Sequence, residues 1–93
     1  MGRPSAMHGG AVAGLIEQAG RATVLEALDE PGSAIMLISM TVDYLRAAPM
    51  RECRAQGEVV KLGGRVANIA VEARAEDLAK PFAAARLTFL ISR

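Results

Sequence analysis

The chain has 93 residues, with eleven basic and ten acidic side chains and a formal net charge of +1. This length predicts a single domain over residues 1–93, near the small end of what folds alone, where a partner subunit would help to bury apolar surface. The even charge, with no block of one sign, argues against nucleic acid and against an anionic membrane as partners.

Cysteine, histidine and apolar content narrow the class of protein further. A single cysteine, Cys53, excludes an internal disulfide, and with the one histidine, His8, it makes no metal-ligand cluster. No apolar run reaches the roughly 18 residues needed to cross a bilayer, and the first ten residues lack the apolar core of a signal peptide. We therefore expect a cytoplasmic protein with no metal site and no membrane span.

Residues 10–28 predict one long helix. Its apolar residues are spread around most of the helical circumference, a pattern typical of a helix that is buried on several sides. Pro31 and Gly32 follow, and this pair both stops a helix and begins a turn.

Four strands are expected after the helix, over residues 38–44, about 52–62, 67–74 and 83–92. The first alternates apolar residues from Ile38 to Tyr44 with polar ones, and the last two alternate more cleanly. Gly63 and Gly64 predict a two-residue hairpin turn, because glycine accepts positive φ. The short connections leave no room for crossovers, so the sequence predicts an α+β fold with the helix across one face of an antiparallel sheet.

One carboxylate, Glu17, lies in the predicted helix among alanine, leucine and isoleucine. On a helical wheel it shares a sector of roughly 60° with Gly10, Gly14 and Arg21. The two glycines carry no side chain, so they leave space for a ligand or another backbone to pass along the helix. Glu17 is therefore the candidate functional carboxylate of the chain.

Gly9 and Gly10 fall where the helix is expected to begin, and the first backbone N–H groups of a helix have no partner within it. Such groups are ready donors for an oxyanion. Glu17 lies about 10 Å further along the axis from Gly10, too far for both to act on one atom unless a substrate runs between them. Two copies with antiparallel helices would bring the carboxylate of one to the helix start of the other, giving a shared site.

The residues alone leave other interpretations open. Glu17 and Arg21 are four positions apart, the spacing of an ordinary exposed ion pair on a helix. His8 also fits a polar residue ahead of a helix. Cys53 and Ser39 have no base that the sequence makes visible, and neither lies in a nucleophile-elbow motif, which argues against a serine or cysteine hydrolase.

The stretches HGGAVAGLIEQAG at 8–20, VDYLRAA at 42–48 and GEVVKLGGRVANIAVEAR at 57–74 carry a resemblance when taken together. The first is similar to an HGG motif with an acid nine positions after the histidine, the second to a strand motif ending in Tyr-Leu-Arg-Pro, and the third to a central hairpin. These are features of the hotdog-fold acyl-coenzyme A thioesterases of the phenylacetic-acid-degradation and 4-hydroxybenzoyl type. The resemblance implies a long helix wrapped by an antiparallel sheet, in homodimers and often homotetramers.

By this resemblance the protein is a hydrolase that cleaves acyl-coenzyme A to the free acid and coenzyme A without a cofactor. Glu17 would be catalytic, as general base or nucleophile, the Gly9 N–H of the other subunit would polarise the thioester carbonyl, and His8 would shape the turn. The residues expected to contact the substrate, along the helix and at the hairpin and strand ends, are Gly10, Gly14, Arg21, Arg46, Lys61 and Arg65. Surface solvation explains the last three equally well.

The chain also departs from the family pattern. Members usually carry about one more strand and a short helix before the HGG motif, whereas seven residues precede His8, so the first strand of the family is expected to be missing. Gly2 stands where many members have Asn or Gln, and Ala47 where the strand motif ends in proline. We expect either part of a longer enzyme or a minimal hotdog protein. The alternative function is a non-catalytic acyl-coenzyme A-binding or dimerisation module, ahead of a hotdog dehydratase, whose HFP-like segment the sequence lacks.

Overall fold

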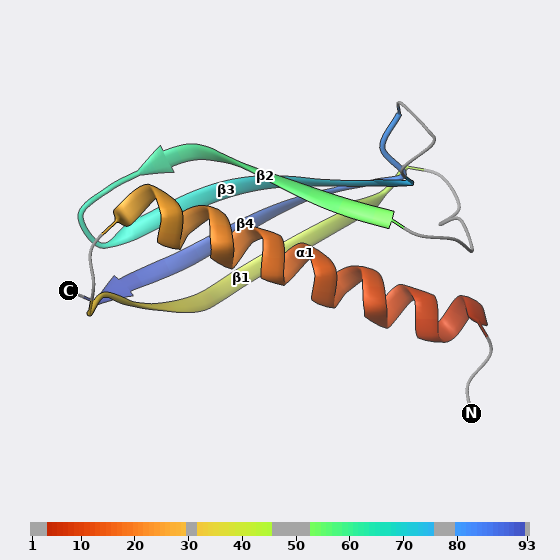
Figure 1. Ribbon diagram of the computed structural model, residues 1–93, viewed down its shortest axis with the longest axis horizontal. Coiled ribbons are helices and arrows are strands. Elements are labelled where there is room, and N and C mark those ends of the chain that lie inside the picture. The colour runs from red at the N-terminus through yellow and green to blue at the C-terminus, as the bar shows by residue number, and fades with distance from the viewer. Residues whose placement is uncertain (1–3, 30–31, 46–52, 76–79, 93) are drawn as a thin grey trace.

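The computed structural model describes residues 4–29, 32–45, 53–75 and 80–92, with side chains from residue 12 onward. The elements, in chain order, are the helix α1 (Pro4–Leu28) and the strands β1 (Ala34–Tyr44), β2 (Cys53–Leu62), β3 (Val66–Ala75) and β4 (Ala83–Ser92). The strands form one antiparallel sheet in the order β1-β4-β3-β2, and α1 lies against one face of it (Figure 1). The expected arrangement of one long helix on four antiparallel strands is confirmed.

A narrow line of buried residues holds the helix to the sheet. Every fourth residue along the helix from position 12 is buried; these are Val12, Ile16, Gly20, Val24 and Leu28. A spacing of four drifts slowly around a helix of 3.6 residues per turn, so α1 crosses the strands at an angle. Ala22 and Leu25 are exposed, Leu25 by 46%. The expectation of a helix buried on several sides is wrong for one copy, because its single sheet covers only one side.

Strands β3 and β4 form the packed floor beneath α1. As expected, alternate residues of both strands point toward the helix and are buried; the largest are Ile69, Val71, Leu87 and Phe89. The same face of β1 is only half-buried, because β1 is an edge strand with a neighbour on one side only and α1 makes little contact with it. The core therefore lies between α1 and the two central strands. The side chains on the helix side of β1 remain partly exposed to solvent.

A bulge interrupts the alternation of β1. Leu37 and Ser39 pair with consecutive residues of β4, so Ile38 has no partner residue there. A bulge breaks the two-residue period of a strand, and Ile38 is 52% exposed. The prediction of one buried face from Ile38 to Tyr44 is therefore wrong at both ends. Ile38 is exposed because of the bulge. Tyr44 is exposed because α1 makes little contact with β1.

The helix begins at Pro4, six residues before its predicted start at Gly10. Proline is favoured at the first position of a helix, because the N–H it lacks would have no partner there. No helix in the described ranges is long and apolar enough to cross a membrane. Gly9 and Gly10 lie inside α1, so the prediction that they begin the helix is wrong. The first turns of the helix, drawn in red, extend past the sheet (Figure 1).

The β2–β3 hairpin is where the glycine pair predicts it, but its turn is different. Residues 63–65 join the strands, and the Gly63 N–H donates to the Val66 carbonyl at 2.8 Å. Gly32 is the one glycine with positive φ among the described residues, so neither Gly63 nor Gly64 uses the left-handed backbone. The expected two-residue turn is therefore replaced by a three-residue one.

A left-handed residue that is not glycine ends α1. Asp29 has a φ of 48°, and its N–H donates to the Leu25 carbonyl at 3.1 Å. This single bond from the residue beyond the cap is the αL form of helix termination, in which glycine is the preferred residue. A side chain with a Cβ costs roughly 1 kcal/mol or more in this conformation.

We predict that Asp29→Gly raises the free energy of unfolding by about 0.5–1 kcal/mol, since relief of the left-handed strain outweighs the greater freedom of glycine in the unfolded chain. Urea unfolding at an unchanged m-value measures the difference. Asp29→Ala keeps the Cβ and is expected to gain nothing. A glycine variant less stable than the wild type would contradict this account of the helix end.

Strand β2 approaches α1 closely at Gly57. A Cβ at that position would overlap the Thr23 hydroxyl and lie 3.2 Å from the Ala19 carbonyl oxygen. The Thr23 hydroxyl is itself fixed, because it donates to the same carbonyl at 2.7 Å. Glycine is therefore required for this edge strand to lie against the helix.

Gly57→Ala is expected to lower the free energy of unfolding by about 1–3 kcal/mol, because the added methyl group must push β2 away from the helix backbone. The matched control is Gly64→Ala, where a Cβ meets no atom within 4 Å. Its effect should stay within about 0.5 kcal/mol. Equal effects of the two substitutions in the same unfolding measurement would show that the helix does not need this close approach.

Candidate functional site

Glu17 lies midway along α1, one turn before Arg21, whose side chain reaches β1. Its neighbours Ile16 and Gly20 belong to the buried line of the helix, whereas the Glu17 side chain is 40% exposed. The carboxylate therefore leaves the helix at the boundary between packed and open surface. This position gives a ligand access to Glu17 and surrounds it with apolar groups.

Arg21, one turn further along α1, makes three contacts with described residues. Its Nη2 donates to Oε2 of Glu17 at 3.0 Å, which forms the expected ion pair of residues four apart. Its Nη1 donates to the backbone carbonyl of Ile35 on β1 in a longer contact of 3.4 Å. The guanidinium carbon lies 5.6 Å from the centre of the Phe89 ring on β4, within the range of a cation–π contact. The helix, the edge strand and the core thus meet at this one side chain.

Beside Glu17 and Arg21, the helix side of β1 presents a half-covered row of apolar side chains. We call this row the β1 strip; its residues are Ile35, Leu37, Met40 and Val42. Each packs against the core yet is only partly buried, since α1 makes little contact with β1. Open apolar surface next to a carboxylate suits an apolar ligand or a second copy of the helix.

Of the glycines expected to leave space near Glu17, the structure describes the surroundings of Gly14. Gly14, nearly one turn before Glu17, is exposed, and a Cβ there would meet no atom within 4 Å, so the expected space is present at this position. Gly9 and Gly10 lie earlier in the backbone of α1, and the side chain of His8 is outside the described side chains. Gly9 is eight residues from Glu17, about 12 Å along the helix axis, so the two do not meet within one copy.

Of the three basic residues expected to meet coenzyme A, the structure describes Lys61 and Arg65, and neither pairs with Glu17. Lys61 lies on the sheet face away from α1. Arg65 lies in the hairpin turn and lines a hollow at that end of the sheet. Arg46 is outside the described residues. The sheet therefore separates Lys61 from the Glu17 of the same copy.

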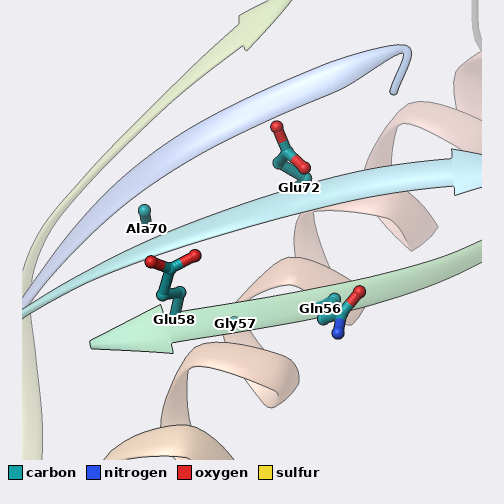
Figure 2. Close-up of a pocket in the computed structure, with 5 residues that line it drawn as sticks. All are labelled: Gln56, Gly57, Glu58, Ala70 and Glu72. Atoms are coloured by element: carbon teal, nitrogen blue, oxygen red, sulfur yellow. The ribbon is translucent and has the colours of Figure 1, made fainter. Parts of the chain in front are cut away.

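A hollow on the face of the sheet away from α1 has the wrong charge for a phosphate-bearing ligand. Figure 2 shows its lining residues on β2 and β3, with α1 behind the strands; they are Gln56, Gly57, Glu58, Ala70 and Glu72. Glu72 pairs with Arg74 at 2.6 Å, and Glu58 adds a second carboxylate. Carboxylates repel the phosphates of coenzyme A, so this hollow is not part of the candidate site.

The chemistry that the described residues offer is that of a carboxylate. No three His, Cys, Asp or Glu side chains in the described ranges gather where they would hold a metal ion. Ser39 pairs with Thr88 on the face away from α1, and Cys53 is a half-buried residue at the start of β2. Glu17 is thus the described group best placed to act as a general base or a nucleophile.

The same architecture occurs in solved structures of other proteins. A protein from Chromobacterium violaceum is 34% identical, with a TM-score of 0.71 over 92% of this chain and 62% of that one. A protein of the thioesterase superfamily is 32% identical, with a TM-score of 0.79, and the match covers 91% of this chain and 61% of that one. A Bacillus halodurans protein solved with CoA shares the fold at 17% identity, with a TM-score of 0.81 over 89% and 57%. The chain thus spans 57–62% of these proteins. No curated protein matches the sequence significantly.

The helix, the sheet order and these neighbours define a hotdog-fold protein of the thioesterase superfamily. A family model for the acyl-CoA thioesterase N-terminal domain matches residues 1–90. The chain therefore belongs to this acyl-CoA thioesterase family. The family and the fold that the sequence motifs resemble are both confirmed.

Sequence reasoning did not find the partners that hold Arg21. The helical spacing indicates its pair with Glu17, but Ile35 contributes only a backbone carbonyl, for which a sequence carries no signal. Phe89 fits an ordinary core position of a strand, and its contact with Arg21 follows from how the helix lies on the sheet. These contacts arise between elements, beyond the reach of a helical wheel.

Proposed function

We propose that the protein hydrolyses an acyl-coenzyme A thioester, with Glu17 as the catalytic carboxylate. The observation that carries the proposal is the place of Glu17 in a member of the acyl-CoA thioesterase family. It lies nine residues after the histidine of an HGG sequence and is half-exposed, paired with Arg21, whose guanidinium reaches the first residue of the β1 strip. Thioester hydrolysis needs little more than a carboxylate, oxyanion donors and apolar surface, because a thiolate is a good leaving group.

In the proposed reaction a water molecule gives a proton to Glu17 while its oxygen attacks the carbonyl carbon of the thioester. The carbonyl oxygen becomes an oxyanion, which backbone N–H donors stabilise. The C–S bond then breaks, and the leaving thiolate of coenzyme A takes up the proton as the free acid forms. Direct attack by Glu17, through an anhydride that water hydrolyses, is the alternative route with the same residue.

The oxyanion donor in this proposal is the Gly9 N–H of a second copy. The separation of about 12 Å between Gly9 and Glu17 on one helix is bridged when two helices pack antiparallel. Because α1 begins at Pro4, the Gly9 N–H becomes a free donor only when the turns before it open. Those turns extend past the sheet, which supports their opening against a partner (Figure 1).

The β1 strip and the glycine side of α1 are the proposed contacts of the acyl group. Gly14 leaves room beside Glu17 for the thioester, and the β1 strip offers aliphatic side chains to the acyl chain. Lys61 and Arg65 lie away from the Glu17 of their own copy, so in this scheme they serve the coenzyme A phosphates of a neighbouring site. Basic side chains at a phosphate favour its binding through charge-assisted hydrogen bonds.

We predict that the protein releases thiol from acyl-coenzyme A and that Glu17→Gln lowers kcat by about 100-fold or more, since an amide neither accepts the proton nor attacks the carbonyl. Glutamine keeps the size of the side chain, and the Glu17–Arg21 pair is largely exposed. The free energy of unfolding should therefore change by less than about 1 kcal/mol. A thiol-detecting reagent with aromatic, short-chain and medium-chain acyl-coenzyme A esters measures the rate.

The matched control is Glu26→Gln, which removes an exposed carboxylate from the same helix and is expected to keep kcat unchanged. Wild-type turnover by Glu17→Gln would reject Glu17 as the catalytic residue. Binding of acyl-coenzyme A by the wild type without release of thiol would instead favour the non-catalytic binding module.

A further inference from the structure

The contacts of Arg21 favour a role that differs from its expected one as a substrate ligand. An arginine carries five N–H donors in a fixed planar fork, and each bond that it makes within the chain restricts where the fork can lie. Both terminal nitrogens of Arg21 are engaged within the chain, Nη2 with Glu17 and Nη1 with the Ile35 carbonyl. One face of the guanidinium also lies over the Phe89 ring. Two of its five N–H donors are therefore used within its own copy, on two different elements.

These contacts make the pair of Glu17 and Arg21 different from an ordinary exposed ion pair. Two long side chains four residues apart on a helix normally exchange between rotamers, and the carboxylate moves with them. Here the guanidinium is attached at its far end to the backbone of β1 and rests on a ring that is completely buried in the core. A planar, rigid fork held in this way fixes the direction of the bond that it donates to the carboxylate.

We propose that Arg21 is a positioning residue, which holds the Glu17 carboxylate by Oε2 so that Oε1 faces the thioester and the attacking water. This inference rests on the proposed role of Glu17. Within the described part of the chain, the bond from Arg21 is the one hydrogen bond to the Glu17 side chain, and it occupies Oε2. The opposite oxygen, Oε1, accepts no hydrogen bond from the described residues, and the side chain that carries it is 40% exposed.

Arg21 also links the carboxylate to the surface that would carry the acyl group. Ile35, whose carbonyl Arg21 holds, is the first residue of the β1 strip. The distance between Glu17 and the β1 strip is therefore bridged by one side chain, although α1 and β1 otherwise make little contact. Without Arg21, the Glu17 carboxylate would be free to rotate, and its distance from the β1 strip would no longer be fixed. An error of about 1 Å in the position of a reacting group can lower a rate by roughly 100-fold.

The test compares Arg21→Met with Arg21→Lys in the full chain, by acyl-coenzyme A hydrolysis and thermal unfolding. Methionine keeps an unbranched stem over Phe89 but removes the charge and both donors, so kcat should fall about 10- to 100-fold with little change in KM. Lysine keeps the charge with a single-point donor and should recover part of the loss. Arg86→Met, which removes an exposed arginine from the other face of the sheet, should match the wild type.

The decisive measurement repeats Arg21→Met in the Glu17→Gln background. A residue that acts through Glu17 has nothing left to position there, so the remaining rate should not fall further. A fall by the same factor in both backgrounds would overturn the proposal, as would a raised KM with unchanged kcat, which marks a substrate ligand. If the methionine variant does not fold, the effect of Arg21→Lys on kcat in the two backgrounds decides between the same outcomes.

Failure of this inference is distinct from failure of the proposed function. An inactive wild type, or an active Glu17→Gln variant, overturns the function and the role of Arg21 with it. Strong loss of turnover in Glu17→Gln together with wild-type kcat in Arg21→Met overturns the positioning role alone.

Discussion

The line of residues that α1 buries against the sheet determines the rest of this structure. Because the line repeats every fourth residue, the helix crosses the sheet at an angle and offers only one side to it. Gly57 allows β2 to lie close to the helix backbone, so α1 packs toward that edge of the sheet and away from β1. The β1 strip, which we propose as the acyl-binding surface, is thereby left half-covered.

The uneven packing of α1 also determines the surroundings of the candidate carboxylate, Glu17. Glu17 is 40% exposed and pairs with Arg21, whose guanidinium reaches the half-covered strand β1. The carboxylate would be poorly oriented as an isolated exposed side chain, and Arg21 supplies a connection to the sheet that the helix itself does not make. One copy presents the acid and the apolar strip, but the glycine amides of its own helix are too distant to complete an oxyanion site.

Much of this architecture was predictable, because strands β3 and β4 alternate strictly and the helix is long. Their buried faces agree with the sequence pattern residue by residue, and the HGG motif with Glu17 indicated the family that the comparisons show. The errors have local physical causes: the bulge at Ile38 changes the period of β1, and the helix continues back to Pro4. The anchoring of Arg21 could not be predicted, because it depends on a backbone carbonyl and a ring that only the packed helix brings near.

A complementation experiment tests most directly whether the acid of one copy works with the helix entrance of another. Glu17→Gln lacks the acid, and Gly9→Pro lacks the backbone N–H at position 9, so each variant alone should be inactive. Refolding the two in equal amounts makes about half of the dimers mixed, each with one intact shared site, and about a quarter of wild-type turnover should return. A mixture that folds and forms dimers yet stays at the background rate would contradict the account.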